Sequence, residues 1–69
     1  MQETVELIVK MFPEILVNSH KTHEEIVVTK NNRQIFFKVY PEYTLIFDGI
    51  NEPIRTKSIQ ELEQYICSC

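Results

Sequence analysis

Apolar residues recur at helical spacing in the first twelve positions of the chain. One narrow stripe of a helical projection collects four apolar side chains, namely Val5, Ile8, Val9 and Phe12. Leu7 and Met11 widen this stripe to about half of the helix circumference. Pro13 disfavours helical geometry at the residue before it. The pattern therefore predicts a helix over 3–12, one further helical turn from Pro13 to Leu16, and a loop over 18–22.

The next two segments are rich in β-branched and aromatic residues and predict a β-hairpin. The strands are His23–Lys30 and Arg33–Tyr40, and Asn31-Asn32 forms the turn because Asn tolerates a positive φ. A two-residue turn fixes which residues face each other across the hairpin. The expected pairs set apolar against apolar and acid against base: Ile26 with Phe37, Val28 with Ile35, Val27 with Phe36, and Glu25 with Lys38.

Two strands and a helix are expected in the rest of the chain. The nearly continuous apolar run Tyr43–Phe47 predicts an inner strand covered on both faces. Asn51–Lys57 predicts a short edge strand, where Pro53 is tolerated. Ser58 and Glu61 have the spacing of a capping box, which starts a second helix with an apolar stripe of Ile59, Leu62 and Ile66.

These elements predict one domain over residues 1–69 with an α+β fold. The order is α-β-β-β-(β)-α, with two layers, an antiparallel sheet of three or four strands, and a helix at each end. A chain of 69 residues buries only a modest core, so we expect a stability of about 3–5 kcal/mol. The residues expected to be buried are Val5, Ile8, Val9, Phe12, Ile26, Val28, Ile35, Phe37, Leu45, Phe47, Ile59, Leu62 and Ile66.

One face of the predicted sheet is left with apolar residues and no helix. Two short helices cover one face, which leaves the other face for a protein partner or a second copy of the chain. The residues expected on this partner surface are Val27, Phe36, Tyr40 and Ile46, extended by Leu7 and Met11 of the first helix. The alternative is that the helices cover opposite faces, or that neighbouring side chains half-bury the aromatic residues.

Charge argues against nucleic acid as the partner. The net charge is −3, and the seven Lys and Arg residues are scattered rather than gathered on one face. Nucleic-acid binders depend on neutralising phosphates with a basic surface. The apolar runs are also too short to span a membrane, and Met1-Gln2-Glu3-Thr4 lacks the basic start of a signal peptide. We therefore expect a cytoplasmic protein.

The candidate chemistry is sparse. Four zinc-type ligands are present, namely His20, His23, Cys67 and Cys69, but their spacings fit no common zinc pattern. The cysteines are too close in sequence for a disulfide, and a terminal Cys-Ser-Cys without a GTPase domain does not predict prenylation. With one Gly there is no phosphate-binding loop, and no nucleophile has a recognisable base. We expect no enzymatic activity, no cofactor, no bound metal and no small-molecule substrate.

Two functions remain. The favoured hypothesis is a protein-interaction module, acting as an adaptor, inhibitor or subunit by surface binding. The Lys-, Asn- and Ile-rich composition also suggests an AT-rich bacterial or phage origin. The alternative is RNA or DNA binding, because helix, three strands and helix is also the order of double-stranded-RNA-binding domains. Those domains need lysines at the start of the last helix, where this chain has Arg55-Thr56-Lys57-Ser58 followed by acids.

Overall fold

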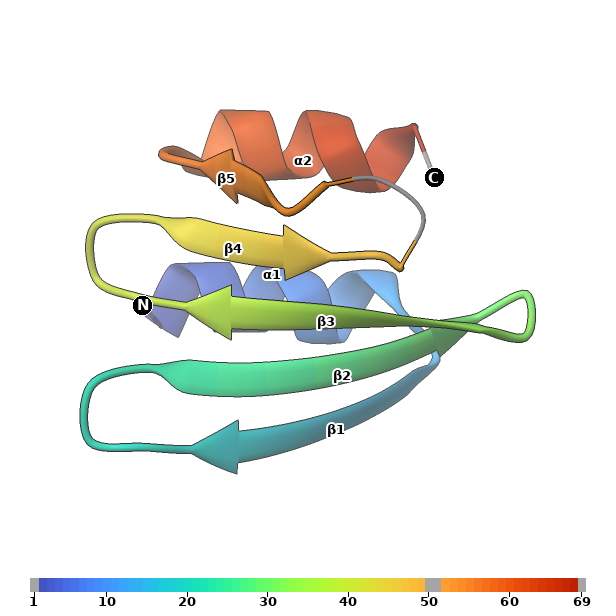
Figure 1. Cartoon of the computed structure of the whole chain (residues 1–69), viewed down its shortest axis with the longest axis horizontal. Coiled ribbons are helices and arrows are strands. Elements are labelled where there is room, and N and C mark those ends of the chain that lie inside the picture. The colour runs from blue at the N-terminus through green and yellow to red at the C-terminus, as the bar shows by residue number, and fades with distance from the viewer. Residues whose placement is uncertain (1, 50–51, 69) are drawn as a thin grey trace.

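Two helices and a five-stranded antiparallel sheet make up the computed structural model, which describes residues 2–49 and 52–68. The helices are α1 (Gln2–Met11) and α2 (Ile59–Cys67). The strands follow one another in space as they do in sequence: β1 (Glu14–Ser19), β2 (Glu24–Lys30), β3 (Arg33–Val39), β4 (Thr44–Phe47) and β5 (Ile54–Thr56) (Figure 1). The predicted α+β class with a helix at each end is confirmed.

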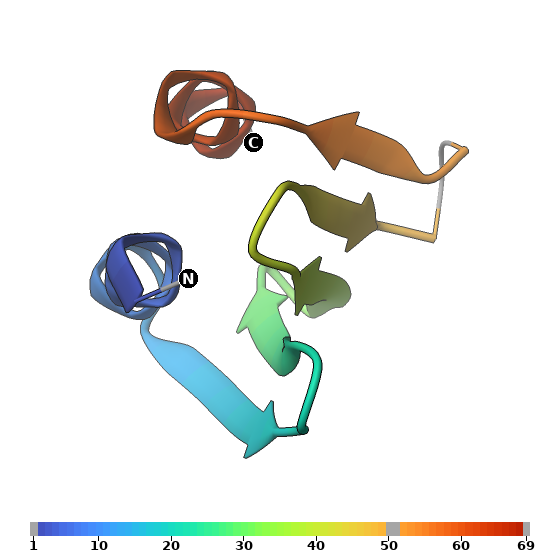
Figure 2. The same ribbon diagram turned by 90° about the vertical axis from the view of Figure 1, so that its left-hand side faces the viewer.

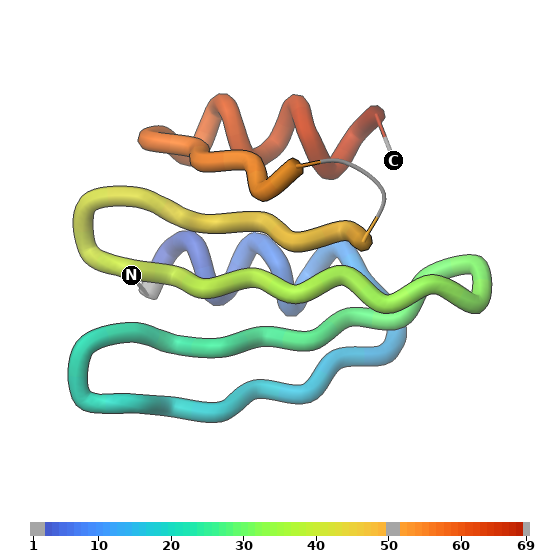
Figure 3. The backbone as a smooth tube through the Cα atoms, viewed as in Figure 1, coloured from blue at the N-terminus to red at the C-terminus, as the bar shows by residue number. Residues whose placement is uncertain are grey.

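The central hairpin forms as its sequence predicts. Both turn residues have positive φ, 54° at Asn31 and 64° at Asn32, which is the geometry of a tight two-residue hairpin turn. Strand β2 pairs with β3 in the expected register, with Ile26 opposite Phe37 and Glu25 opposite Lys38. The turns β1–β2 and β3–β4 lie together at the other end of the sheet (Figure 3).

Residues Glu14–Ser19 form strand β1. The predicted helical turn at Pro13–Leu16 is therefore wrong, and so is the start of the loop predicted over 18–22. Strand β1 runs antiparallel to β2, with Ile15 opposite Val28 and Val17 opposite Ile26. Pro13 ends α1, and the following Ile-Leu-Val run has the branched side chains that favour a strand. Pairing with β1 satisfies the backbone N–H and C=O groups on the outer edge of β2, which would lack these partners if residues 14–19 formed a loop. The sheet therefore has five strands instead of the three or four expected. The predicted edge strand over Asn51–Lys57 is the shorter β5, and Asn51 lies outside the described residues.

Both helices lie on the same side of the sheet, which makes two layers (Figure 2). The core between the layers is continuous from α1 across the sheet to α2. Phe12, directly after α1, contacts Phe37 of β3 with ring centroids 6.0 Å apart. The buried apolar residues are Ile8, Phe12, Ile26, Val28, Ile35, Phe37, Val39, Ile46, Leu62 and Ile66.

Three of the predicted core positions on the helices are less buried than expected. Val9 is 41% exposed, so its assignment to the core is wrong. Ile8 points into the core, and the next residue on a helix is turned away from it by about 100°. Val5 and Ile59 are half-buried. The apolar stripe of α1 is therefore wider than its contact with the sheet.

The face assignment of β4 is also corrected. Val39 pairs with Thr44 and Phe37 with Ile46, so Ile46 faces the helices and is 0% exposed. Leu45 and Phe47, expected in the core, are half-buried on the opposite face. The strand is an inner one, as predicted, but a helical layer covers only one of its faces. With apolar side chains at 45, 46 and 47, the pattern could not decide the face, and the turn before β4 decides it.

The predicted cap of α2 at Ser58 is confirmed, but Glu61 reaches back to the amide of Lys57 rather than to that of the cap residue, as it would in a capping box. The Ser58 hydroxyl accepts a hydrogen bond from the Glu61 amide at 3.2 Å. The Glu61 carboxylate in turn accepts from the amide of Lys57 at 2.6 Å, one residue before the cap. At the other end of the helix, the Tyr65 hydroxyl donates to Asp48 at 3.3 Å and ties α2 to the end of β4.

Removing the cap should measurably destabilise the domain. Ser58→Ala is expected to lower the free energy of unfolding by about 1 kcal/mol, because it leaves the Glu61 amide without its side-chain acceptor. Ser58→Asp keeps an acceptor and should cost much less. Urea denaturation followed by circular dichroism measures both, and equal stabilities of the two variants would contradict the capping role.

Candidate functional site

The face of the sheet turned away from both helices is here called the open face (Figure 2). Three neighbouring rows of side chains cross the strands on this face, beside a fourth, polar row of Glu14, Thr29 and Gln34. The rows follow from strand pairing, since residues directly opposite each other project to the same side. The apolar row consists of Leu16, Val27, Phe36 and Phe47. Leu16 is 61% exposed and Phe36 is 45% exposed. Large apolar side chains thus run across four strands without a helix above them.

A charged row lies directly beside the apolar row. It consists of Asn18, Glu25, Lys38, Leu45 and Arg55, one residue from each strand. The Lys38 ammonium turns towards the apolar row, where it lies 5.8 Å from the centroid of the Phe47 ring. The Arg55 guanidinium lies 5.7 Å from the Tyr43 ring on the other side. Both cations therefore already have an aromatic partner.

A row of rings closes the end of the open face, formed by His20, His23, Tyr40 and Tyr43. Successive ring centroids are 4.8, 4.8 and 5.0 Å apart. Two backbone bonds hold the row in place, from the His20 amide to the His23 carbonyl at 2.9 Å and from Tyr40 to Tyr43 at 2.8 Å. Because each ring lies against the next, the faces of the inner rings are already occupied.

A hollow opens over the middle of this face. Its volume is about 600 Å³, and it lies above β2, β3 and the end of β4. Val27, Phe36 and Phe47 supply its apolar wall, and Glu25, Gln34 and Lys38 are among its polar lining. Three of the four residues of the apolar row therefore line a depression, and Leu16 lies outside it.

The sequence-predicted partner surface is only partly gathered here. Val27, Phe36 and Tyr40 lie on the open face, as expected. Ile46 is buried under the helices and cannot belong to the surface. Leu7 packs against the core and Met11 is exposed, but both belong to α1 in the layer on the other side of the sheet.

Sequence reasoning missed several open-face residues. Leu16 was overlooked because β1 was not recognised as a strand. Leu45 and Phe47 were assigned to the wrong face of β4. Tyr43 could have been found from the short Pro41-Glu42 turn, which places Tyr43 beside Tyr40.

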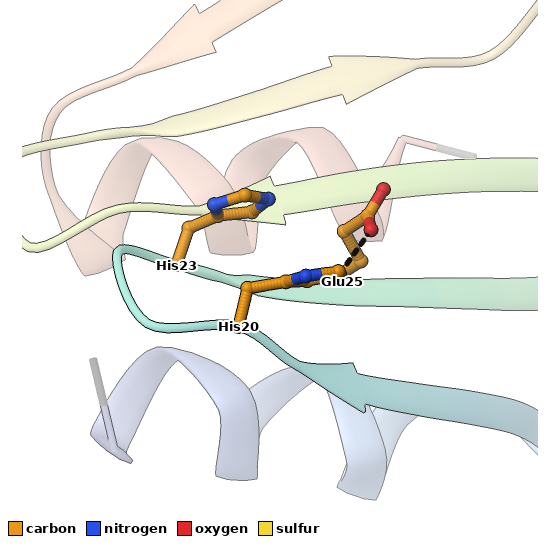
Figure 4. Close-up of side chains that lie close together, drawn as sticks. All are labelled: His20, His23 and Glu25. Atoms are coloured by element: carbon orange, nitrogen blue, oxygen red, sulfur yellow. Dashed lines mark ion pairs between the residues drawn. The ribbon is translucent and has the colours of Figure 1, made fainter.

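Among the described residues, the two histidines gather with a carboxylate and not with Cys67. The ligand atoms of His20, His23 and Glu25 all lie within 4.8 Å of one another. Figure 4 shows the two imidazole rings one over the other, with the His20 Nε2 paired to the Glu25 carboxylate. Cys67 is a free, exposed thiol at the end of α2, and Cys69 lies outside the described residues.

Comparison with protein-family models, with curated protein sequences and with solved structures found no significant match for this chain. Within residues 2–49 and 52–68, neither helix has the length and apolar character needed to cross a membrane. Function is therefore inferred from the geometry of the open face.

Proposed function

We propose that this chain is a small, non-catalytic protein-interaction module that binds protein through the apolar row of its open face. The observation that carries the proposal is the exposure of Leu16 and Phe36 in one row on the side of the sheet without helices. Leaving such side chains in water forgoes about 25 cal/mol for each Å² that association would cover. A central apolar patch beside a polar row is also typical of protein interfaces.

A second copy of the chain is the partner that this face fits. In this dimer the two open faces meet, and a two-fold axis runs between the two sheets, parallel to the strands and above the line between β2 and β3. This axis sets β2 over β3 of the other copy and β1 over β4. The smaller Val27 then faces the partner's Phe36, and Leu16 faces the partner's Phe47. In the charged row, Glu25 faces the partner's Lys38. One patch thus supplies both the apolar and the charged complement that a two-fold dimer needs.

Binding through base stacking is disfavoured by the same geometry. Bases stack on exposed ring faces beside a positively charged groove. In the row of rings the inner faces are covered by neighbouring rings, and Lys38 and Arg55 are engaged with Phe47 and Tyr43. Glu25 and a net charge of −3 further weaken any attraction for phosphate.

The exposed thiol of Cys67 suits a reducing compartment, and we propose that the module acts in the cytoplasm.

Sedimentation velocity over a range of concentrations tests the dimer. The wild type should show a concentration-dependent dimer, and Phe36→Glu should abolish it because a carboxylate would be buried at the centre of the interface. Met11→Glu is the matched control, since Met11 is also an exposed apolar residue but lies on α1. It should leave the dimer intact.

Chemical cross-linking tests the orientation of the two copies. In a background with Cys67→Ser and Cys69→Ser, the pair Leu16→Cys and Phe47→Cys places thiols three strands apart within one chain, about 14 Å. Packed sheets are only about 10 Å apart, so a short bismaleimide should join the two sites between copies. Either single cysteine should give no cross-linked dimer. A wild type that stays monomeric into the high-micromolar range, or that binds oligonucleotides in a salt-sensitive way, would contradict the proposal.

A further inference from the structure

We propose that His20, His23 and Glu25 form a binding site for a divalent transition-metal ion of the zinc type. The site lies at the turn between β1 and β2, at the end of the open face, and it shares Glu25 with the interface proposed above. Two imidazole nitrogens and one carboxylate oxygen are a donor set that zinc accepts in proteins. Imidazole donors favour zinc, cobalt, nickel and copper over magnesium or calcium.

The backbone brings the three side chains to one place. His20 and His23 face each other across the last pair of the β1–β2 hairpin, which the bond from the His20 amide to the His23 carbonyl closes at 2.9 Å. Glu25 lies two residues after His23, so it projects from the same face of β2. The side chains therefore start from fixed positions on a short hairpin rather than from separate loops (Figure 4).

The distances are close to those of a coordinated ion. The three ligand atoms lie within 4.8 Å of one another. Around a tetrahedral zinc with bonds of about 2.0–2.1 Å, neighbouring ligand atoms are about 3.3–3.4 Å apart. Closing the widest of these separations takes up to about 1.5 Å, which is within reach of side-chain rotation, because rotation about the terminal torsions of His and Glu is broad.

A hydrogen-bonding partner outside the metal site already orients one of the ligands. The Thr22 hydroxyl lies 3.0 Å from Nδ1 of His23. In the tautomer whose Nδ1 donates to this hydroxyl, Nε2 of His23 keeps its lone pair for the metal. Histidine ligands are commonly fixed in this way through their second nitrogen.

Binding requires one rearrangement. The rings of His20 and His23 are stacked with an interplanar angle of 14°, and the lone pairs of two nearly parallel rings cannot both point at one ion. His20 is at the end of the row of rings and partly exposed, so it can turn at the cost of one ring contact. The metal then replaces the present pairing of His20 with Glu25. Three protein ligands leave a fourth position open to water or to a side chain of a bound protein.

Zinc titration by isothermal calorimetry, in the Cys67→Ser and Cys69→Ser background, tests the site without thiol ligands. One zinc per chain should bind at micromolar protein concentration, and Co²⁺ should give the visible bands of a site with fewer than six ligands. Each of His20→Ala, His23→Ala and Glu25→Gln should weaken zinc binding by more than about a hundredfold. This loss exceeds the one expected for a residue that only hydrogen-bonds to a ligand. Thr22→Val should weaken zinc binding by about tenfold.

Glu24→Gln is the matched control. Glu24 is the neighbouring carboxylate, but it accepts a hydrogen bond from the Ser19 hydroxyl at 2.6 Å and is not one of the three clustered ligands. Zinc affinity should be unchanged in this variant, and circular dichroism with chelator should show every variant folded. Absence of zinc binding by the parent protein would overturn the proposal. Equal losses in Glu24→Gln and Glu25→Gln, or full binding by His20→Ala, would overturn it as well.

Discussion

Phe37→Ala is expected to cost about 3–5 kcal/mol, which approaches the whole stability of a domain of this size. Phe37 is among the largest fully buried side chains, lies on the central strand β3 and contacts Phe12 beneath the sheet. Truncation leaves a cavity between α1 and the sheet that no neighbouring element is free to fill. Thermal and urea unfolding should show a largely unfolded variant at room temperature.

The neighbouring phenylalanine provides the control. Phe36 precedes Phe37 on the same strand but points to the open face and is 45% exposed. At low protein concentration, where association does not contribute, Phe36→Ala should cost about 1 kcal/mol or less. Similar destabilisation by the two substitutions would mean that both faces of β3 are packed, and that the open face is not open.

The central hairpin was predictable because several independent signals agree there. The Asn31-Asn32 turn, the apolar residues that it sets opposite one another, and the Glu25–Lys38 pair all specify one register. The cap at Ser58 is equally local, since its donor and acceptor are three residues apart. Features determined within a few residues of sequence are those that pattern reasoning recovers.

Strand β1 was not predictable in the same way. Its apolar stretch is only Ile15–Val17, and it follows a proline that opens a helical turn as readily as a strand. What stabilises it as a strand is pairing with the free edge of β2, which the residues of β1 alone do not reveal. Ser19 and His20 were therefore assigned to a loop, although they lie at the end of the strand and its closing pair.

The candidate sites likewise contain some residues that the local sequence predicts and others that depend on the pairing of β1 with β2. Val27, Phe36 and Tyr40 followed from the hairpin register alone. The row of rings and the cluster of His20, His23 and Glu25 depend on β1, so the sequence offered the histidines without the carboxylate that joins them. Once β1 is paired with β2, Glu25 and His23 are on one face by simple alternation.

The most severe effect is expected for Ile46→Asp, which should prevent folding. Ile46 is 0% exposed and lies opposite Phe37 in the core beneath the helices. A carboxylate there would be buried among apolar side chains, and neither of its adjacent strand partners, Phe37 and Ile54, offers it a cation. Desolvating an unpaired charge costs several kcal/mol, in addition to the lost packing of isoleucine. Circular dichroism should show loss of the cooperative transition.

Leu45→Asp is the adjacent comparison and decides which face of β4 is buried. Leu45 is half-buried on the open face, and its partners across the strands are Lys38 and Arg55. An aspartate at this position has two cations beside it and access to water, so the variant should fold with a modest loss of stability. The sequence-based assignment of Leu45 and Phe47 to the core implies the reverse order, with Leu45 inside and Ile46 outside. A folded Ile46→Asp variant beside an unfolded Leu45→Asp variant would therefore show that β4 is paired one residue out of the register found here.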